Sequence, residues 1–285
     1  MKPVVLVDLR DRNSGEQFMS LPHRGAGWKF DLPSPKESAP PQESTSNLEP
    51  PPNRIHSNYL ELPRSILLFR GYWLVIGPIL LFIVTIGSTF LLYTHFTSSL
   101  KINHELTTVL IAILVGAFVL ITPYIRFELE LPRDEPIRFN RHRRKVYFYQ
   151  YRMDRLHPFG RKNWGVKPVA YNWDDLTAEA YRIYAPMGYG GLKEEVRISV
   201  RKPGTDEVID RFFFTDDIEK GKQYWDIARA FMQQGPEALP EFVNPPWDWN
   251  EGIHSNPFDQ RAPKVQWPAE MDLESRTAPS PGEQP

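Results

Sequence analysis

The stretch that decides the fold is residues 71–93, GYWLVIGPILLFIVTIGSTFLLY, in which 23 consecutive residues carry no charge. A second uncharged stretch, LTTVLIAILVGAFVLITPYI at residues 106–125, follows after a short connection. At 1.5 Å per residue they make helices of roughly 35 Å and 30 Å, enough to cross a hydrocarbon core of about 30 Å. The alternative, two buried helices of a soluble protein, is less favoured because apolar residues surround both helices. We therefore expect a transmembrane hairpin.

The basic residues beside these stretches predict their orientation. Arg64 and Arg70 precede the first stretch, Arg126 follows the second, and the connection at residues 94–105 has only Lys101 as a firm cation. Because positive residues favour the cytoplasmic side, we expect both termini in the cytoplasm and a short loop outside. The first stretch is too long, and too far from the start of the sequence, for a cleaved signal peptide.

The two stretches predict an anchor, because neither contains Asp, Glu, Lys, Arg or His, the residues that mark ion pathways in membranes. Ala112 and Gly116 have the small-xxx-small spacing that lets another helix approach closely. They are candidates for helix–helix packing, although such pairs also arise by chance. A homo-oligomer therefore stays open.

After residue 125 the pattern changes from helical to alternating. Apolar and polar residues alternate at 127–131, 137–139 and 146–151, and further strands are expected at 166–173, 176–184, 195–201 and 208–214. A helix follows, capped by Thr215 or Asp216 and stopped by Gly235-Pro236, with an apolar stripe that includes Trp225 and Phe231. The sequence thus predicts an α+β membrane protein with an antiparallel β-rich domain and a C-terminal helix.

Proline marks the expected domain boundaries, because it lacks an amide donor and has a fixed φ. Of the 28 prolines, seven lie within residues 33–52 and ten within residues 236–285. We expect an N-terminal segment at 1–32, a Pro-rich linker at 33–58, the transmembrane hairpin at 59–125 with spans at 71–93 and 106–125, a cytoplasmic domain at 126–240 and a Pro-rich tail at 241–285. In the tail, Trp247 and Trp249 are expected to pack on the domain; the alternative is a peptide ligand for a partner.

Positive charge gathers just after the second stretch. Residues 126–167 hold twelve Lys or Arg against five Asp or Glu, a net +7, although the whole chain is at -1. A polar turn between two expected strands contributes five of these cations, Arg138, Arg141, Arg143, Arg144 and Lys145. Anionic lipid attracts such cations at roughly 1 kcal/mol each. They are candidate membrane-surface contacts; the alternatives are a solvated turn or the topology signal itself.

No enzyme chemistry is legible in the chain. Cysteine is absent, which excludes thiolate nucleophiles and cysteine zinc sites. The seven histidines form no metal-ligand spacing, and the Gly-rich stretch at 188–191 lacks the Gly-Lys-Ser/Thr of a phosphate-binding loop. We therefore expect no catalytic residues, no metal and no cofactor. Nucleic acid is not expected as a partner, although the aromatic strand near residue 149 is of a kind that stacks bases.

Two resemblances add to this interpretation. Antiparallel strands followed by one amphipathic helix, over about residues 126–240, resemble the pleckstrin-homology-like fold. The whole layout resembles an uncharacterised family of bacterial inner-membrane proteins (domain of unknown function 6708 type). The residues that carry the second resemblance are PIRFNR at 136–141, KVY at 145–147, NWDDL at 172–176 and AFMQQGP at 230–236.

Members of that family are often encoded beside type VI secretion genes. The resemblance therefore implies a bacterial inner-membrane protein with the lipid bilayer and a protein partner, an effector or a secretion component, as its contacts. The expected function is that of a non-enzymatic membrane-anchored interaction protein, with an accessory or immunity role in type VI secretion. The alternative is a membrane-tethered scaffold or sensor that docks a cytoplasmic partner or anionic lipid.

Overall fold

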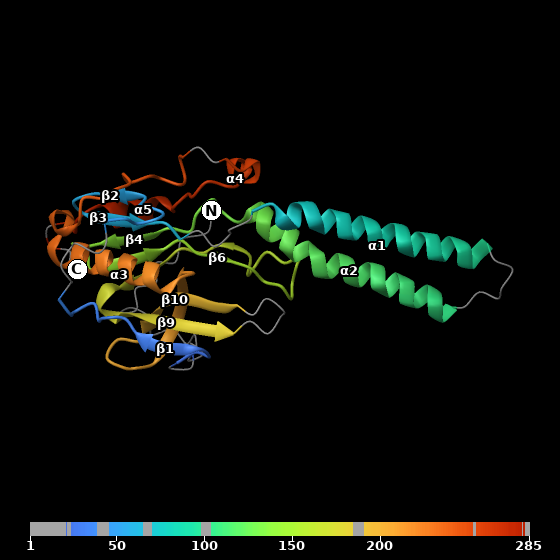
Figure 1. Ribbon diagram of the computed structural model, residues 1–285, viewed down its shortest axis with the longest axis horizontal. Helices are drawn as coiled ribbons and strands as arrows, with labels where there is room; N and C mark the ends of the chain where they lie inside the picture. The colour runs from blue at the N-terminus through green and yellow to red at the C-terminus, as the bar shows by residue number, and fades with distance from the viewer. Residues whose placement is uncertain are drawn as a thin grey trace.

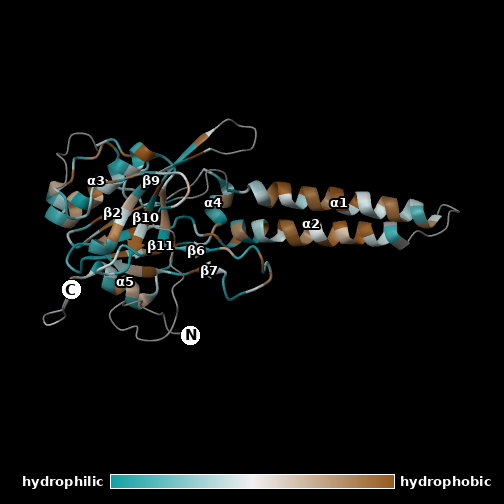
Figure 2. Ribbon diagram, turned by 90° about the horizontal axis from the view of Figure 1, so that it is seen from below, coloured by the Kyte–Doolittle hydropathy of each residue, from teal (hydrophilic) through white to brown (hydrophobic). Residues whose placement is uncertain are grey.

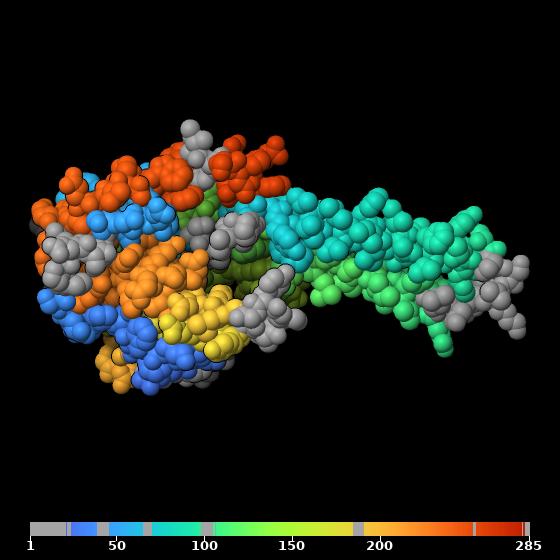
Figure 3. Space-filling model, viewed as in Figure 1, coloured from blue at the N-terminus to red at the C-terminus, as the bar shows by residue number. Residues whose placement is uncertain are grey.

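Two long helices form a hairpin that extends from one end of a β-rich body (Figures 1 and 3). The structure is a computed structural model that describes residues 21, 24–38, 46–64, 70–97, 104–184, 191–252, 255–280 and 282. The hairpin consists of helix α1, Tyr72–Thr97, and helix α2, His104–Glu130. Both are long and apolar enough to cross a membrane, and Figure 2 shows hydrophobic residues along most of their length. Lys101, and most of the Gly-rich stretch at 188–191, lie outside the described residues.

The two helices approach each other closely near the body, at Gly77. A Cβ atom there would lie 2.9 Å from the side chain of Ile125, so only glycine lets α2 come this near. Ala112 and Gly116, by contrast, do not face α1: Ala112 is exposed, and a Cβ on Gly116 would have nothing within 4 Å. Packing of these two residues against a helix of another chain stays a prediction.

The body contains two antiparallel sheets (Figure 1). One sheet has the order β1-β9-β10-β11, formed by Trp28–Asp31, Leu176–Tyr184, Leu192–Arg201 and Val208–Thr215. The other has the order β2-β3-β4-β5-β8, formed by Arg54–Ile55, Tyr59–Leu62, Ile137–Asn140, Lys145–Phe148 and Val169–Asn172. A small ribbon pairs β6, Tyr151–Arg152, with β7, Gly165–Val166. The helices after β11 are α3, Ile218–Gln234, α4, Pro257–Arg261, and α5, Ala269–Arg276.

The hydrophobic core lies between the two sheets and the apolar face of α3. Phe148 of one sheet stacks on Phe212 of the other with ring centroids 4.2 Å apart, and Trp225 of α3 lies 4.9 Å from Trp173. The N-cap of α3 is Asp217, one residue after the expected candidate Asp216. Its carboxylate accepts a hydrogen bond from the Lys220 amide at 2.8 Å. The predicted α+β class with two long apolar helices and antiparallel sheets is confirmed.

The hairpin is an insertion between two neighbouring strands. β3 precedes α1 in the chain and β4 follows α2, yet the two strands pair directly, with Tyr59 opposite Asn140 and Leu62 opposite Ile137. The body therefore begins well before the hairpin, and the expected domain start at residue 126 misses β1, β2 and β3. The sequence conceals this arrangement because the strands on the N-terminal side are only two to four residues long.

The described part of the Pro-rich segment 33–58 packs on α3, although a linker was expected there. Its backbone carbonyls accept hydrogen bonds from α3 side chains: Trp225 Nε1 donates to the carbonyl of Pro33 at 2.8 Å and Tyr224 Oη donates to that of Pro50 at 2.5 Å. Leu48 is buried among the core residues. Extended proline-rich chain suits this role because its carbonyls are not used in secondary structure.

A buried polar cluster joins the strands that flank the hairpin. The guanidinium of Arg64, just after β3, donates to the backbone carbonyls of Glu135, Tyr149 and Phe213 at 3.0, 3.1 and 2.9 Å. The carboxylate of Asp134 accepts from the Arg64 amide at 2.8 Å and from Asn53 Nδ2 at 2.9 Å. Burial lowers the pKa of Arg64. It raises the pKa of Asp134 to about 6, against the hydrogen bonds that favour the charged carboxylate.

Asp134→Asn is expected to flatten the pH dependence of unfolding. The folded-state pKa of Asp134 lies above its ordinary value of 3.8, so its contribution to stability is complete below about pH 4 and is lost as pH rises through about 6. The difference corresponds to about 3 kcal/mol of unfolding free energy. Denaturant titrations in detergent, followed by tryptophan fluorescence at several pH values, measure it.

The matched control is Asp206→Asn, on the exposed turn between β10 and β11. That variant is expected to keep the wild-type slope. An unchanged slope in Asp134→Asn would show that the carboxyl of Asp134 does not titrate as the buried geometry requires.

Candidate functional site

Arg70 holds the base of the hairpin to the body. Its guanidinium is buried just before α1 and donates to the backbone carbonyls of Leu131 at 2.8 Å and Pro132 at 2.5 Å, directly after α2. Its Nε lies 2.8 Å from the carboxylate of Asp259 in α4. Burial lowers the pKa of Arg70, and the nearby Asp259 opposes that shift. One side chain thus ties together the start of α1, the end of α2 and the C-terminal segment.

Glu128 of α2 caps the neighbouring helix. Its Oε2 accepts from the backbone amides of Gly71 at 3.2 Å and Leu74 at 3.0 Å, at the start of α1. The first amides of a helix have no partner within it, and a negative charge there is stabilised by the helix dipole. The two helices are therefore joined at their body end by charged contacts as well as by packing.

Helix α4 closes over this junction (Figure 1). The side chain of Asn256, which caps α4, donates to the carbonyl of Arg70 at 3.0 Å. Phe258 packs on Gly71, where a Cβ atom would lie 2.2 Å from a carbon of the phenyl ring. Gly71 also has φ +101°, a conformation that favours glycine. This contact could not be predicted from the sequence, because Gly71 lies within the first uncharged stretch.

The loop between β6 and β7 reaches along the body end of α2 (Figures 1 and 2). Arg126 of α2 donates from Nη1 to the carbonyls of Pro158 at 2.8 Å and Gly160 at 2.6 Å. These are the residues on either side of Phe159, so Arg126 holds the backbone of the loop at that point. The Phe159 ring stacks on Phe118 of α2 with centroids 6.2 Å apart.

The loop is held in shape by Asp154. Its carboxylate accepts from Asn163 Nδ2 at 3.0 Å and from the Leu156 and His157 amides at 3.1 and 3.2 Å, and it lies 2.9 Å from His157 Nδ1. The hydrogen bonds from Asn163 and His157 lower the pKa of Asp154. The only acidic group of residues 151–167 is therefore engaged within the loop.

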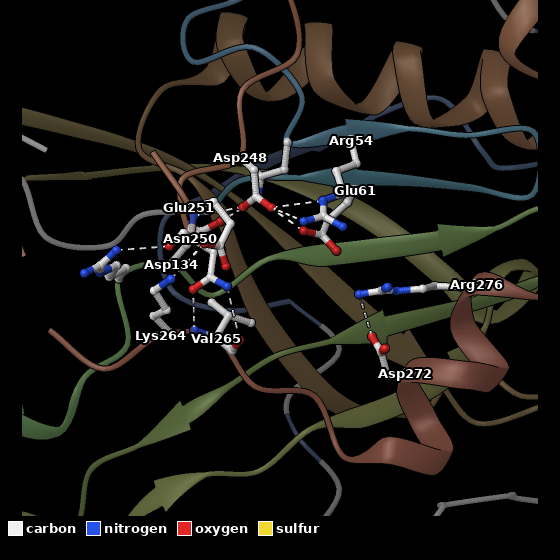
Figure 4. Close-up of polar contacts among 12 residues, drawn as sticks. Arg54, Glu61, Asp134, Asp248, Asn250, Glu251, Lys264, Val265, Asp272 and Arg276 are labelled. Atoms are coloured by element: carbon white, nitrogen blue, oxygen red, sulfur yellow. Dashed lines mark hydrogen bonds and ion pairs between the residues drawn. The ribbon is translucent and has the colours of Figure 1, made fainter. Parts of the chain in front are cut away.

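The C-terminal segment, residues 241–280, packs across the body instead of trailing as a tail. Figure 4 shows Asp248 turned toward Arg54 and Asn250 toward Val265. At Trp247 the backbone of the segment is held on the body, since its amide donates to the Pro52 carbonyl at 3.0 Å, and its ring lies 4.5 Å from that of Trp249 within the same segment. Prolines interrupt the segment, so it has no helical periodicity from which its packing on the body could be predicted.

Helix α5 packs against the basic turn whose five cations were predicted to contact lipid. Arg138 is 2% exposed and pairs with Glu61 at 2.6 Å and Asp272 at 2.9 Å. Lys145 pairs with Glu274 at 3.0 Å, and Arg143 Nε donates to the Thr277 carbonyl at 3.1 Å. These cations bind the acidic face and the C-terminal end of α5.

The other two predicted contacts lie at the same turn. Arg144 pairs with Asp174 at 2.5 Å, and the Arg141 guanidinium lies against Gly235 at the end of α3. Asp174 lies two residues before the first residue of β9, whose start is the end away from the hairpin (Figure 1). A strand of this length spans about 30 Å. Contact between these five cations and lipid stays a prediction that this position does not favour.

Among the residues that the structure describes, no group of three or more His, Asp or Glu side chains is arranged to hold a metal ion. The arrangement that stands out is the hairpin base, where aromatic and basic side chains meet. Trp73 stacks on Tyr124 at 4.7 Å, Arg155 lies over Tyr124 at 5.6 Å, and Arg126 lies over Trp164 at 4.3 Å. Of these residues the sequence analysis used Arg126, as a signal for the orientation, and it did not predict that the β6–β7 loop lies at the hairpin base.

Gly71→Ala is expected to loosen α4 from the hairpin base, because a Cβ would clash with Phe258 and the backbone conformation would be strained by about 1–3 kcal/mol. Limited trypsin digestion in detergent measures this as faster cleavage at Arg261 and Lys264. Gly87→Ala is the control, since a Cβ there has nothing within 4 Å. Equal cleavage of both variants would contradict the proposed role of Gly71.

Comparison with known proteins gives one match. Neither a curated protein nor a solved structure matches the chain. Residues 113–279 match a family of unknown function, DUF6708. The matched range starts inside α2 and ends just beyond α5, so it includes the body end of α2, the β6–β7 loop and nearly all of the C-terminal segment, whereas Arg70, Gly71 and α1 lie before it. Because it covers more than half of the 285 residues, the chain belongs to the DUF6708 family.

Proposed function

We propose that this chain is a non-enzymatic, membrane-anchored interaction protein whose hairpin crosses a bilayer twice. The observation that carries the proposal is the outward surface of the hairpin: in α1 only Gly77 and Ser88 are buried, and large apolar side chains such as Phe82 at 65% and Leu120 at 70% are exposed. An exposed apolar surface of this extent is unfavourable in water and suits lipid.

The charge distribution supports an orientation with the body in the cytoplasm. The segment with a net charge of +7, residues 126–167, begins in the last five residues of α2, at its body end, and continues into the body. Positive residues beside a span favour the cytoplasmic side. The body would then be held at the inner face of the membrane, with the hairpin tip outside.

The rigid attachment supports an interaction role over that of a simple tether. Arg70, Glu128 and Phe258 fix the body to the hairpin, so the body keeps one orientation toward the bilayer. Its far end then faces the cytoplasm. A pocket of about 370 Å³ opens there, lined by charged side chains that include Lys36, Asp174 and Arg201. We propose this end as the place where a protein partner binds.

The finer proposals come from the resemblances. The order of antiparallel strands followed by α3 supports a pleckstrin-homology-like body. From the resemblance to inner-membrane proteins that are often encoded beside type VI secretion genes, we propose a bacterial inner-membrane location and an accessory or immunity role in type VI secretion. A scaffold or sensor that docks another cytoplasmic protein is the alternative.

Single-cysteine labelling tests the topology, because the chain has no cysteine of its own. Lys101→Cys is expected to react with a membrane-impermeant maleimide in intact cells, whereas Leu273→Cys, on the exposed side of α5, is expected to react only after the cells are opened. Labelling of both positions in intact cells, or recovery of the protein in the soluble fraction without detergent, would contradict the proposal.

A deletion strain tests the immunity role. Cells that lack this protein are expected to be killed on contact with secretion-competent sister cells, and re-expression is expected to restore survival. Re-expression of an Arg201→Glu/Lys36→Glu variant, which reverses two charges in the distal pocket, is expected to protect less if the partner binds there. Unharmed survival of the deletion strain removes the immunity role.

Co-purification in detergent then distinguishes an accessory from a scaffold role. A secretion component among the co-purified proteins favours the accessory role, and another regulatory protein favours the scaffold role.

A further inference from the structure

The β6–β7 loop has the composition of a surface that binds anionic lipid. Residues 151–167 contain five Lys or Arg and one Asp, a net +4 with histidine neutral. Asp154 is engaged inside the loop, as described above. Arg155, Arg161 and Lys162 are exposed, and none of them takes part in an ion pair with a described residue. Arg161 and Lys162 therefore present their charge to solvent, and the exposed Arg155 lies beside them with its guanidinium over the ring of Tyr124 at 5.6 Å.

Two large apolar side chains are exposed among these cations. Leu156 is 87% exposed and Phe159 is 63% exposed, although each is held in a loop of defined conformation. Exposed apolar residues that are rimmed by charge mark interaction surfaces. Alternation of apolar and basic residues is the pattern of segments that lie in a membrane interface, with the apolar groups at the acyl boundary and the cations among the headgroups.

The position of the loop agrees with such an interface. The stacked pair Trp73 and Tyr124 is of the aromatic type found at membrane edges. Phe118, on which Phe159 stacks, lies about 9 Å closer to the hairpin tip than Tyr124, at 1.5 Å per residue. Interfacial segments bury their apolar side by about 5–10 Å. Phe159 is thus at the depth where the ring of a docked loop enters the acyl boundary.

The cations of the loop also act on one another. Burial, together with the nearby Arg152 and Lys162, lowers the pKa of Lys167. Such mutual repulsion is relieved when anionic groups bind beside the cations. Arg126 remains directed to the Pro158 and Gly160 carbonyls, so it fixes the loop while the exposed cations stay free for headgroups.

We propose that the β6–β7 loop docks on the inner surface of the membrane, with Leu156 and Phe159 in the acyl boundary and Arg155, Arg161 and Lys162 on anionic phospholipid headgroups. This inference rests on the proposed function, since it requires the hairpin to span the bilayer. It assigns the lipid contact to the hairpin end of the body and leaves the distal pocket to a protein partner.

Environment-sensitive labels test the docking in the full chain. Leu156→Cys and Phe159→Cys are made one at a time, so that the other apolar side chain remains, and are labelled after reconstitution into vesicles of phosphatidylcholine and phosphatidylglycerol in equal parts. Both labels are expected to shift to a lipid-like emission and to be quenched by lipids with a nitroxide near the headgroup. Leu273→Cys, 67% exposed on α5, is the control that stays accessible to aqueous iodide.

A label in the hairpin separates the two proposals. Ile86→Cys, exposed in the middle of α1, is expected to be quenched by lipids with a nitroxide deep in the acyl chain. If that label is not quenched, the membrane-spanning function fails. If it is quenched while the labels at residues 156 and 159 are as accessible to iodide as the label at 273, the loop does not dock and only the present inference is overturned.

Charge variants test the headgroup contact. Arg161→Gln/Lys162→Gln is expected to lower the equilibrium constant for docking of the loop by about fivefold per cation on the anionic vesicles. On phosphatidylcholine alone no such decrease is expected. The matched control Lys36→Gln/Lys202→Gln removes the same charge at the distal pocket and is expected to leave docking unchanged. Equal effects of the two pairs, or docking that does not depend on phosphatidylglycerol, would overturn the assignment to anionic lipid.

Discussion

The buried guanidinium of Arg70 is the contact on which the arrangement of this protein depends. A charged group is costly to bury unless its donors are bound, and here carbonyls after α2 and the Asp259 carboxylate bind them. The partners come from two separate parts of the chain, and Arg70 itself stands at a third. The start of α1, the end of α2 and α4 are therefore fixed relative to one another, and a shift of any of them would leave part of the charge unpaired.

Insertion of the hairpin between β3 and β4 extends this constraint to the sheets. Paired strands lie about 4.8 Å apart, so the two ends of the excursion from residue 63 to residue 136 are held close together by backbone hydrogen bonds. Arg64 and Asp134 then fill the space at these ends with a buried, hydrogen-bonded polar cluster. The body cannot rotate freely against the hairpin, as it would on a single linker.

The sequence predicts those parts of the fold that carry a local pattern. The two spans, the strand at 176–184 and the helix from Ile218 to Gln234 follow from uncharged length, alternation and helical periodicity. Segments rich in proline have no such period, and their packing depends on backbone carbonyls, which every residue has. The partners of the basic turn are likewise about 130 residues distant in α5. Nothing local distinguishes a cation that binds a helix from one that binds lipid.

The same reasoning explains why the sequence could not separate the two basic regions that follow α2. Both have a high density of Lys and Arg within a short range, yet their surroundings differ. At the β4–β5 turn, carboxylates and carbonyls of the C-terminal segment take up most of the positive charge. At the β6–β7 loop the one carboxylate is turned inward, and exposed apolar side chains stand between the cations. A cation whose donors are already bound by protein gains little from a headgroup, whereas a solvated cation beside an apolar anchor gains both attraction and proximity. Charge density alone therefore cannot identify a lipid contact, and the partners of each cation decide it.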